Sequence, residues 1–145
     1  MNSSGDIAET CFIHQCYLRG FKAFLPFSHD TKTDVIIKRP GERPISVQVK
    51  KGTLQKNPPH LTQTWKALVG SAKSSNRRDN GVPRFTKYKA HAITGFLPFD
   101  VLAVYIQEHD KWVLHRLADI VGKASIRWND DHDADNFDLL DTINQ

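Results

Sequence analysis

The sequence predicts an α/β fold with a mixed sheet of about five strands, flanked by helices. Two observations lead to this prediction. The chain begins with an apolar pattern at helical spacing, and later segments read as β-strands, one of which alternates strictly between apolar and polar residues. The 145 residues suit one domain of ordinary size with a buried core, so we expect a single domain over residues 1–145.

The composition is that of an ordinary globular protein of the reduced cytoplasm. No apolar run approaches the roughly 20 residues of a membrane-spanning helix, so no membrane partner is expected. The first ten residues lack the basic region and apolar core of a signal peptide. Cys11 and Cys16 are five residues apart in a predicted helix, which places them on different parts of its surface. We therefore expect no disulfide between them.

Basic charge is concentrated in the middle of the chain. The 20 Lys and Arg residues against 16 Asp and Glu residues give a formal net charge of +4. Six of the 16 acidic residues follow Trp128, where no Lys or Arg stands, so residues 1–128 carry +10 (20 basic against 10 acidic). Most of this excess lies in Lys38–His91, with 13 basic residues against Glu42 and Asp79. Such clustering favours nucleic acid as partner over a merely solvated basic surface.

The first predicted element is a helix over Ser3–Gly20. Asp6 and Glu9 stand in its first turns, where the helix dipole favours acids, and Gly20 is a suitable C-terminal stop. The apolar stripe at helical spacing consists of Ile7, Ala8, Cys11 and Phe12. Glu9 borders this stripe. It is either a solvated helix acid or a side chain directed into a site between helix and sheet.

Three strands are predicted next: Phe21–Phe27 and the two strands of a hairpin within Thr33–Gly52. Asp34 opens the first hairpin strand, and Pro40-Gly41 provides turn residues. The second strand alternates, with Ile45, Val47 and Val49 on one face and Ser46, Gln48 and Lys50 on the other. The pairing of such a hairpin can bring an acid, an amide oxygen and an ammonium together, and these groups suit a metal ion and a phosphate.

The middle of the chain is expected to be largely irregular. Thr53–His60 is polar and contains two prolines, and Lys73–Lys89 is read as a basic loop with turn residues. Leu61–Ala72 fits either a strand or one face of a helix, and we favour the strand because Gly70-Ser71 follows so soon. Lys and Arg neutralise phosphates, so this loop is the candidate for contact with a phosphate backbone. Together with the hairpin, it supplies the predicted DNA-binding residues Lys51, Lys73, Arg77, Arg78, Arg84 and Lys87.

The last third reads as strands followed by an acidic tail. The predicted elements are strands at Phe99–Ile106 and Trp112–His115, a helical turn at Leu117–Val121 and a strand at Ala124–Trp128. The tail, Asn129–Gln145, is acidic but contains Phe137, Leu139, Leu140 and Ile143. We expect a short docked helix there, and a solvated acidic loop over Asp130–Asp133. A further hypothesis is that the tail docks on a neighbouring subunit or screens the basic loop.

The chain thus offers a helix with Glu9, a strand, Asp34 at the start of a second strand, and Gln48-Val49-Lys50 on a third. This layout resembles the PD-(D/E)XK nuclease superfamily, most closely the branch with Gln-x-Lys that includes endonucleases encoded in group I introns of cyanobacteria. The resemblance covers nearly the whole chain apart from Thr53–His91. Its residues are Gly5-Asp6-Ile7-Ala8-Glu9, Gly20-Phe21, Pro26, Asp34, Val47-Gln48-Val49-Lys50, Phe99-Asp100-Val101-Leu102-Ala103-Val104-Tyr105, Trp112 and Asn136-Phe137-Asp138-Leu139-Leu140. Thr33 stands where the motif can have proline, and Gln48 is a weaker metal ligand than a carboxylate.

The resemblance implies a restriction endonuclease-like core and Mg²⁺- or Mn²⁺-dependent hydrolysis of DNA to 5′-phosphate ends. Asp34 and the backbone carbonyl of Val49 are then metal ligands, and Gln48 offers its amide oxygen. Glu9 serves a second metal ion or its water, and Lys50 orients the attacking water and offsets negative charge. One domain cuts one strand, so a homodimer or homotetramer is expected for duplex cleavage.

Three functions stay open on the sequence alone. The first is a homing- or restriction-like endonuclease acting on double-stranded DNA. The second is a resolvase of branched DNA (Holliday junctions) with the same fold. The third is a relative that binds nucleic acid without cutting it, with Gln48 as the mark of a decayed site, although Glu9, Asp34 and Lys50 are all present.

Overall fold

The structure is a computed structural model. It describes residues 4–27, 32–55, 63–69, 78–79, 82–83, 97–123, 125–129 and 134–143. The elements are the helices α1 (Ser4–Leu18), η2 (Gln107–His109), α3 (Leu117–Ile120) and α4 (Leu139–Thr142), and the strands β1 (Lys22–Phe24), β2 (Val35–Lys38), β3 (Ile45–Lys51), β4 (Thr53–Leu54), β5 (Thr64–Leu68), β6 (Arg78–Asp79), β7 (Val82–Pro83), β8 (Val101–Ile106), β9 (Lys111–Arg116) and β10 (Ser125–Asn129). Among these residues, no helix is long and apolar enough to cross a membrane.

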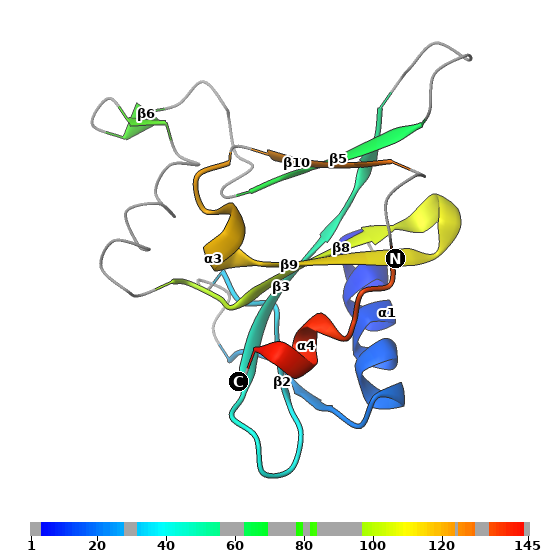
Figure 1. Cartoon of the computed structure of the whole chain (residues 1–145), viewed down its shortest axis with the longest axis vertical. Coiled ribbons are helices and arrows are strands. Elements are labelled where there is room, and N and C mark those ends of the chain that lie inside the picture. Colours follow the sequence, from blue (N-terminus) through cyan, green and yellow to red (C-terminus); the bar gives the residue numbers. More distant parts are fainter. Residues whose placement is uncertain are drawn as a thin grey trace.

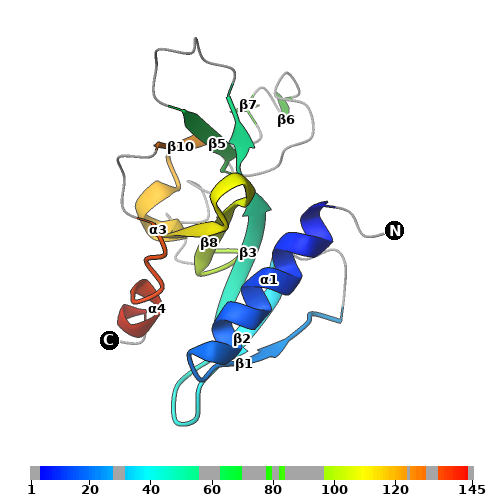
Figure 2. The same cartoon turned by 90° about the vertical axis from the view of Figure 1, so that its right-hand side faces the viewer.

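A five-stranded mixed sheet is the centre of the fold (Figure 1). Its strand order is β1-β2-β3-β8-β9. Strands β3 and β8 run parallel, and the other neighbouring pairs are antiparallel. Helix α1 lies across β2 and β3 on one face of this sheet (Figure 2). The predicted mixed sheet of about five strands with a flanking helix is therefore confirmed.

Strand β8 is buried on both faces, which explains its unbroken apolar sequence. Val101, Ala103 and Tyr105 pack toward α1 and the C-terminal segment. The alternate residues Leu102, Val104 and Ile106 pack in a second core, with Trp65, Trp128 and α3. The sheet is thus covered on both sides, by α1 and the C-terminal segment on one face and by further strands with α3 on the other.

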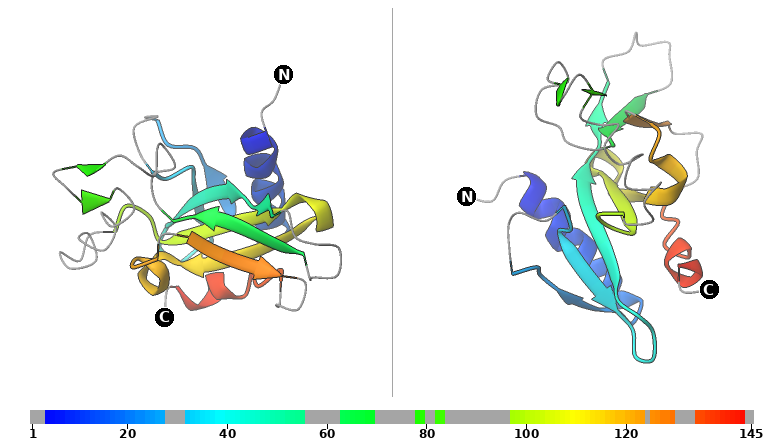
Figure 3. Two further views of the ribbon diagram at one scale, coloured as in Figure 1. Left: turned by 90° about the horizontal axis from the view of Figure 1, so that it is seen from above. Right: turned by 90° about the vertical axis from the view of Figure 1, so that its left-hand side faces the viewer.

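Those further strands form a second sheet that the sequence analysis did not predict. It has the order β10-β5-β4 (Figure 3), so the predicted last strand belongs to it and not to the main sheet. Thr53 and Leu54 form β4, and the expectation of irregular chain over residues 53–60 was wrong at these two residues. Gly52 joins β3 to β4. A side-chain Cβ built at Gly52 would lie 2.9 Å from Cδ1 of Ile106, so only glycine fits this junction without a shift.

Helix α1 buries a stripe that differs slightly from the predicted one. Ala8, Phe12 and Cys16, spaced four residues apart, are buried, whereas Ile7 is 42% exposed. The expectation that Ile7 belongs to the buried stripe was therefore wrong. Both cysteines are free, as predicted, and burial raises the pKa of the Cys16 thiol to about 12. A thiol with so high a pKa stays protonated and unreactive at neutral pH.

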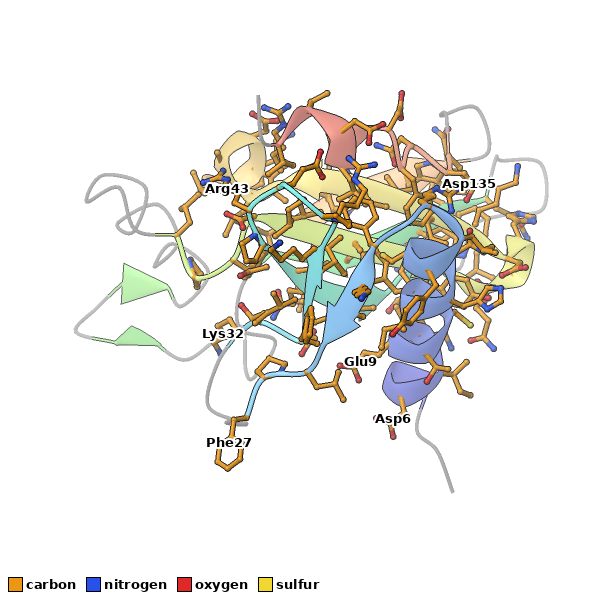
Figure 4. The ribbon with its side chains drawn as sticks, turned by 90° about the horizontal axis from the view of Figure 1, so that it is seen from below. Asp6, Glu9, Phe27, Lys32, Arg43 and Asp135 are labelled. Carbon is orange, nitrogen blue, oxygen red and sulfur yellow. The ribbon has the colours of Figure 1, made fainter. Side chains whose placement is uncertain are left out.

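The predicted strand over Phe21–Phe27 is shorter than expected, because only Lys22–Phe24 pair with β2. Leu25 and Phe27 beyond it are exposed, and Phe27 projects away from the body of the protein (Figure 4). The predicted strand at Trp112–His115 and the helical turn after it are confirmed as β9 and α3.

The C-terminal segment docks on its own chain. Asp135 and Asn136 pair with the edge of β9 through both backbone and side-chain groups: the Asn136 amide accepts from the Leu114 N–H at 2.8 Å and donates to the Leu114 carbonyl at 2.9 Å. Asp141 forms an ion pair with Arg39 at 2.7 Å. This confirms the short docked helix. Residues 134–143 thus pack against the rest of their own chain, and docking of the tail on a neighbouring subunit stays a hypothesis.

Candidate functional site

The site centres on Asp34, which stands directly before β2. Its N–H donates to the Val47 carbonyl at 2.9 Å, and its carboxylate Oδ2 accepts from the Val49 N–H at 2.8 Å. Strand β2 pairs with β3 only from Val35 onward. The Asp34 side chain therefore replaces the missing backbone acceptor beyond the end of β2, which fixes the carboxylate against the central strand.

The backbone of β3 presents the Val49 carbonyl on the same side. In a β-strand, the N–H and C=O of one residue point to the same neighbour, and the next residue serves the opposite neighbour. The N–H of Ser46 bonds to Asp100 next to β8, and the N–H of Val49 bonds to Asp34 next to β2. The Val49 carbonyl consequently lies on the side of Asp34, where β2 has no further residue to pair with it.

Gln48 contributes a buried oxygen without a partner. Its Oε1 is inaccessible to solvent and has no hydrogen bond among the described residues. A buried unpaired polar atom costs roughly 1–3 kcal/mol, so such atoms are rare unless a ligand, ion or water completes them. As the alternation predicted, Gln48 and Lys50 lie two residues apart on one face of β3.

Glu9 reaches the site from α1, where it is half-buried. Burial first, then the charges of Asp34 and Asp6, raise the pKa of the Glu9 carboxyl. In Figure 4 its side chain lies between α1 and the neighbouring strands. Burial also raises the pKa of Asp34, against the opposing effects of the Val49 N–H and of Lys50. The charge of Asp34 thus disfavours the charged form of Glu9, and a bound cation would offset this repulsion.

Lys50 is held at the far end of the same face. Its Nζ donates to the Leu68 carbonyl at 2.7 Å. Burial and the nearby charge of Lys32 lower the pKa of Lys50, while Asp34 opposes the shift. Sequence reasoning did not single out Lys32, which stands in the polar loop before Asp34 and gave no periodic signal.

A basic groove opens beside Lys50. It has a volume of about 580 Å³, and three lysines contribute to its lining. The lining residues are Lys50, Lys51, Thr53, Gln55, Lys66, Ala67 and Leu68. The groove therefore joins the end of β3 to the second sheet. Lys66 was missed by sequence reasoning, although its position between the buried Trp65 and Ala67 marks it as outward-facing.

The structure brings most of the predicted site residues together. Asp34, the Val49 backbone and Lys50 lie together at β3, and Glu9 is close enough to interact with the charge of Asp34. Gln48 lies on the Lys50 face of β3, opposite the face of Val47 and Val49 that packs toward α1. Lys51 lines the groove. Arg78 lies in β6, with only its backbone described, and the predicted DNA contacts outside the described residues are Lys73, Arg77, Arg84 and Lys87.

The donor set suits a hard divalent cation. In the described part of the chain, no group of three or more His, Cys, Asp or Glu side chains could hold a metal ion. The site instead combines two carboxylates with an amide oxygen and a backbone carbonyl. All four are oxygen ligands, the type that Mg²⁺ binds, and Mg²⁺ needs few protein ligands because it keeps several waters.

A solved structure shares this architecture. The bacterial homing endonuclease I-Ssp6803I matches with a TM-score of 0.65 and 16% sequence identity, over 96% of this chain and 93% of its own. The likeness establishes the fold. The Holliday junction resolvase Hjc of Archaeoglobus fulgidus gives a TM-score of 0.49 and 10% identity, over 89% of this chain and 86% of its own. Neither a protein-family model nor a curated protein sequence matches the chain.

Proposed function

We propose that this protein is a metal-dependent DNA endonuclease that hydrolyses phosphodiester bonds and leaves 5′-phosphate ends. The proposal is supported by the Asp34 carboxylate held against Val49 near Lys50, and by the buried, unpaired Gln48 Oε1 on the Lys50 face of β3, beside a groove with three lysines. The fold shared with I-Ssp6803I, a homing endonuclease, supports the same activity.

Asp34, Val49 and Gln48 would hold Mg²⁺ or Mn²⁺, and Glu9 would contribute from α1. When bound, the cation supplies charge to the scissile phosphate and makes a water nucleophilic. The unpartnered Gln48 Oε1 is the best indication of such a ligand, because the described residues offer it no hydrogen bond. The Gln48 amide is neutral, so the negative charge of the site comes from the two carboxylates.

Lys50 has the role of binding the phosphate and orienting the attacking water. Its position is set by the bond to the Leu68 carbonyl, and its burial means that its charge is only weakly screened by solvent. The lowered pKa also eases proton transfer through this amine. The Asp34 carboxylate, held by the Val49 N–H, needs no rearrangement to receive its ligand.

The substrate proposed is double-stranded DNA, in keeping with a homing- or restriction-like enzyme. The proposed contacts to its backbone are Lys51 in the groove and, from the middle segment Lys73–Lys89, Lys73, Arg77, Arg78, Arg84 and Lys87. Cutting both strands needs two such sites, so we propose a homodimer or homotetramer as the working form.

A cleavage assay on supercoiled, linear and four-way-junction DNA, with Mg²⁺, Mn²⁺ or EDTA, tests this function. We expect cleavage of duplex DNA that requires the divalent cation and leaves ends that a ligase can join. Preference for the four-way junction would instead make the protein a resolvase. Binding of all three substrates without cleavage in any cation would contradict the enzymatic function and favour a DNA-binding relative.

A further inference from the structure

The outer face of the second sheet carries a pair of like charges in direct opposition. Lys66 of β5 pairs across strands with Arg127 of β10 and, on its other side, with Thr53 of β4. The neighbours Trp65, Ala67, Ile126 and Trp128 are buried in the core, so the alternation of both strands directs Lys66 and Arg127 outward. Figure 3 (left) looks onto this face, with β5 and β10 in front.

Such a pair is unfavourable in the protein alone. Side chains directly opposite each other in an antiparallel pair have Cβ atoms about 4.5–5.5 Å apart, and like charges there destabilise the sheet. Among the described residues, neither Lys66 nor Arg127 has an ion-pair partner, since both ion pairs found there belong to Arg39. The described residues of β4, β5 and β10 include no acid. A polyanion is the partner that would turn this repulsion into binding.

The pair also continues the groove that starts at the proposed site. Lys50 bonds to the Leu68 carbonyl, and Lys66 lies two residues before Leu68 on the same outer face of β5. Two strand residues span roughly 7 Å, which is about the rise of two base pairs along the DNA helix axis. The row of positive charge therefore leads from the scissile phosphate toward the phosphates that follow it.

We propose that the outer face of the second sheet holds the DNA backbone beside the cleavage site, with Lys66 and Arg127 each contacting a phosphate. This inference rests on the proposed nuclease function for the direction of the strand. It adds two binding residues and a surface outside the middle segment. The row has basic side chains with hydroxyl groups on Thr53 and Ser125, a composition that binds phosphates without reading base sequence.

The test compares two doubly substituted proteins with wild type in DNA binding at several salt concentrations, in EDTA so that no cleavage is required. The first is Lys66→Gln with Arg127→Gln. The second, a matched control, is Lys22→Gln with Lys38→Gln. It also removes two directly opposed basic residues, here from the β1-β2 edge of the main sheet. Each phosphate contact contributes about 0.9 to the slope of log affinity against log salt.

We expect the Lys66/Arg127 variant to lower that slope by about 1–2 and to weaken binding at least tenfold at low salt. The control should keep the wild-type slope. Equal effects of both variants, or an unchanged slope in the first, would overturn the inference while leaving the nuclease function intact. If the variant shows the lowered slope but wild type never cleaves DNA, the surface is supported and the nuclease function is contradicted. Absence of DNA binding by wild type would overturn both.

Discussion

The carboxylate of Asp34 accepts a hydrogen bond from the backbone N–H of Val49, with 2.8 Å between Oδ2 and N. This contact ties the acid at the end of β2 to the central strand of the sheet. It also places the Val49 carbonyl and the Asp34 carboxylate on the same side of β3. The metal ligands we propose are therefore positioned by paired strands, and this rigidity is what a preorganised site requires.

Asp34→Asn should abolish cleavage without destabilising the metal-free protein. The asparagine oxygen can still accept from the Val49 N–H, but the negative charge is lost. Burial raises the pKa of Asp34, so the folded state holds its proton more tightly than the unfolded state does. Stability from this group is present below the unfolded pKa and is lost as pH rises through the folded pKa. As pH rises from 4 to 8, the free energy of unfolding measured in urea should therefore fall less for the variant than for wild type.

The matched control for that substitution is Asp100→Asn. Asp100 accepts from the Ser46 N–H at 2.9 Å on the opposite side of β3, where it extends the pairing with β8. The two acids play the same structural part at the ends of neighbouring strands, but we place only Asp34 in the site. Loss of cleavage in both variants would point to a structural role for both acids and would contradict the assignment of Asp34.

Glu9→Gln should raise the Mg²⁺ concentration needed for half-maximal cleavage by roughly tenfold or more, since one carboxylate near the cation is neutralised. Asp6→Asn is the comparison, because Asp6 is exposed one turn earlier on the same helix. Its substitution should leave the Mg²⁺ requirement unchanged. A titration of initial cleavage rate against Mg²⁺ for the three proteins gives the answer, and identical curves for Glu9→Gln and wild type would remove Glu9 from the site.

Gln48→Glu should strengthen cation binding and weaken the metal-free fold. A third carboxylate would join two groups whose pKa values burial already raises, so repulsion would increase until a cation binds. Thermal unfolding with and without Mn²⁺ measures both effects. We expect a lower Tm than wild type in EDTA and a larger gain in Tm with Mn²⁺. The opposite result, a variant stabilised in EDTA and insensitive to Mn²⁺, would mean that Gln48 faces no metal site.

Asn136→Ala should reduce the free energy of unfolding by about 1–3 kcal/mol, because the N–H and carbonyl of Leu114 would lose their partners at the edge of β9. Asn136→Asp keeps the acceptor but sets a carboxylate against the Leu114 carbonyl, so we expect a similar loss. Urea unfolding followed by circular dichroism measures both. Wild-type stability in both variants would show that the tail is not needed to close this edge.

The sequence predicted the parts of the fold that have a regular pattern. The alternation of Ile45 to Lys50 marked β3, and the apolar run before Gln107 marked a strand buried on both faces. The second sheet was not predicted from the sequence because β4 has only two residues. In addition, β5 pairs with β10, which is distant in the sequence. The closure of β9 by Asn136 also left no pattern, since it depends on side-chain hydrogen bonds.

The residues of the candidate site could be named from the sequence, but not their surroundings. Asp34, Gln48 and Lys50 stand out by motif and spacing, and in the structure Asp34 lies near Lys50, with Gln48 on the Lys50 face of β3. Lys66 and Arg127 do not stand out, because they are single basic residues in separate strands and meet only through strand pairing. Periodicity could have shown that each faces outward, but not that they face each other.

The most direct test of the nuclease proposal is single-turnover cleavage of DNA by wild type and Lys50→Ala, in Mg²⁺ and in EDTA, with DNA binding measured on the same preparations. We predict cleavage by wild type in Mg²⁺ alone, and a loss of roughly 10²- to 10⁴-fold in the variant while it still binds DNA. Cleavage at the wild-type rate by Lys50→Ala, or equal cleavage in EDTA, would contradict the account.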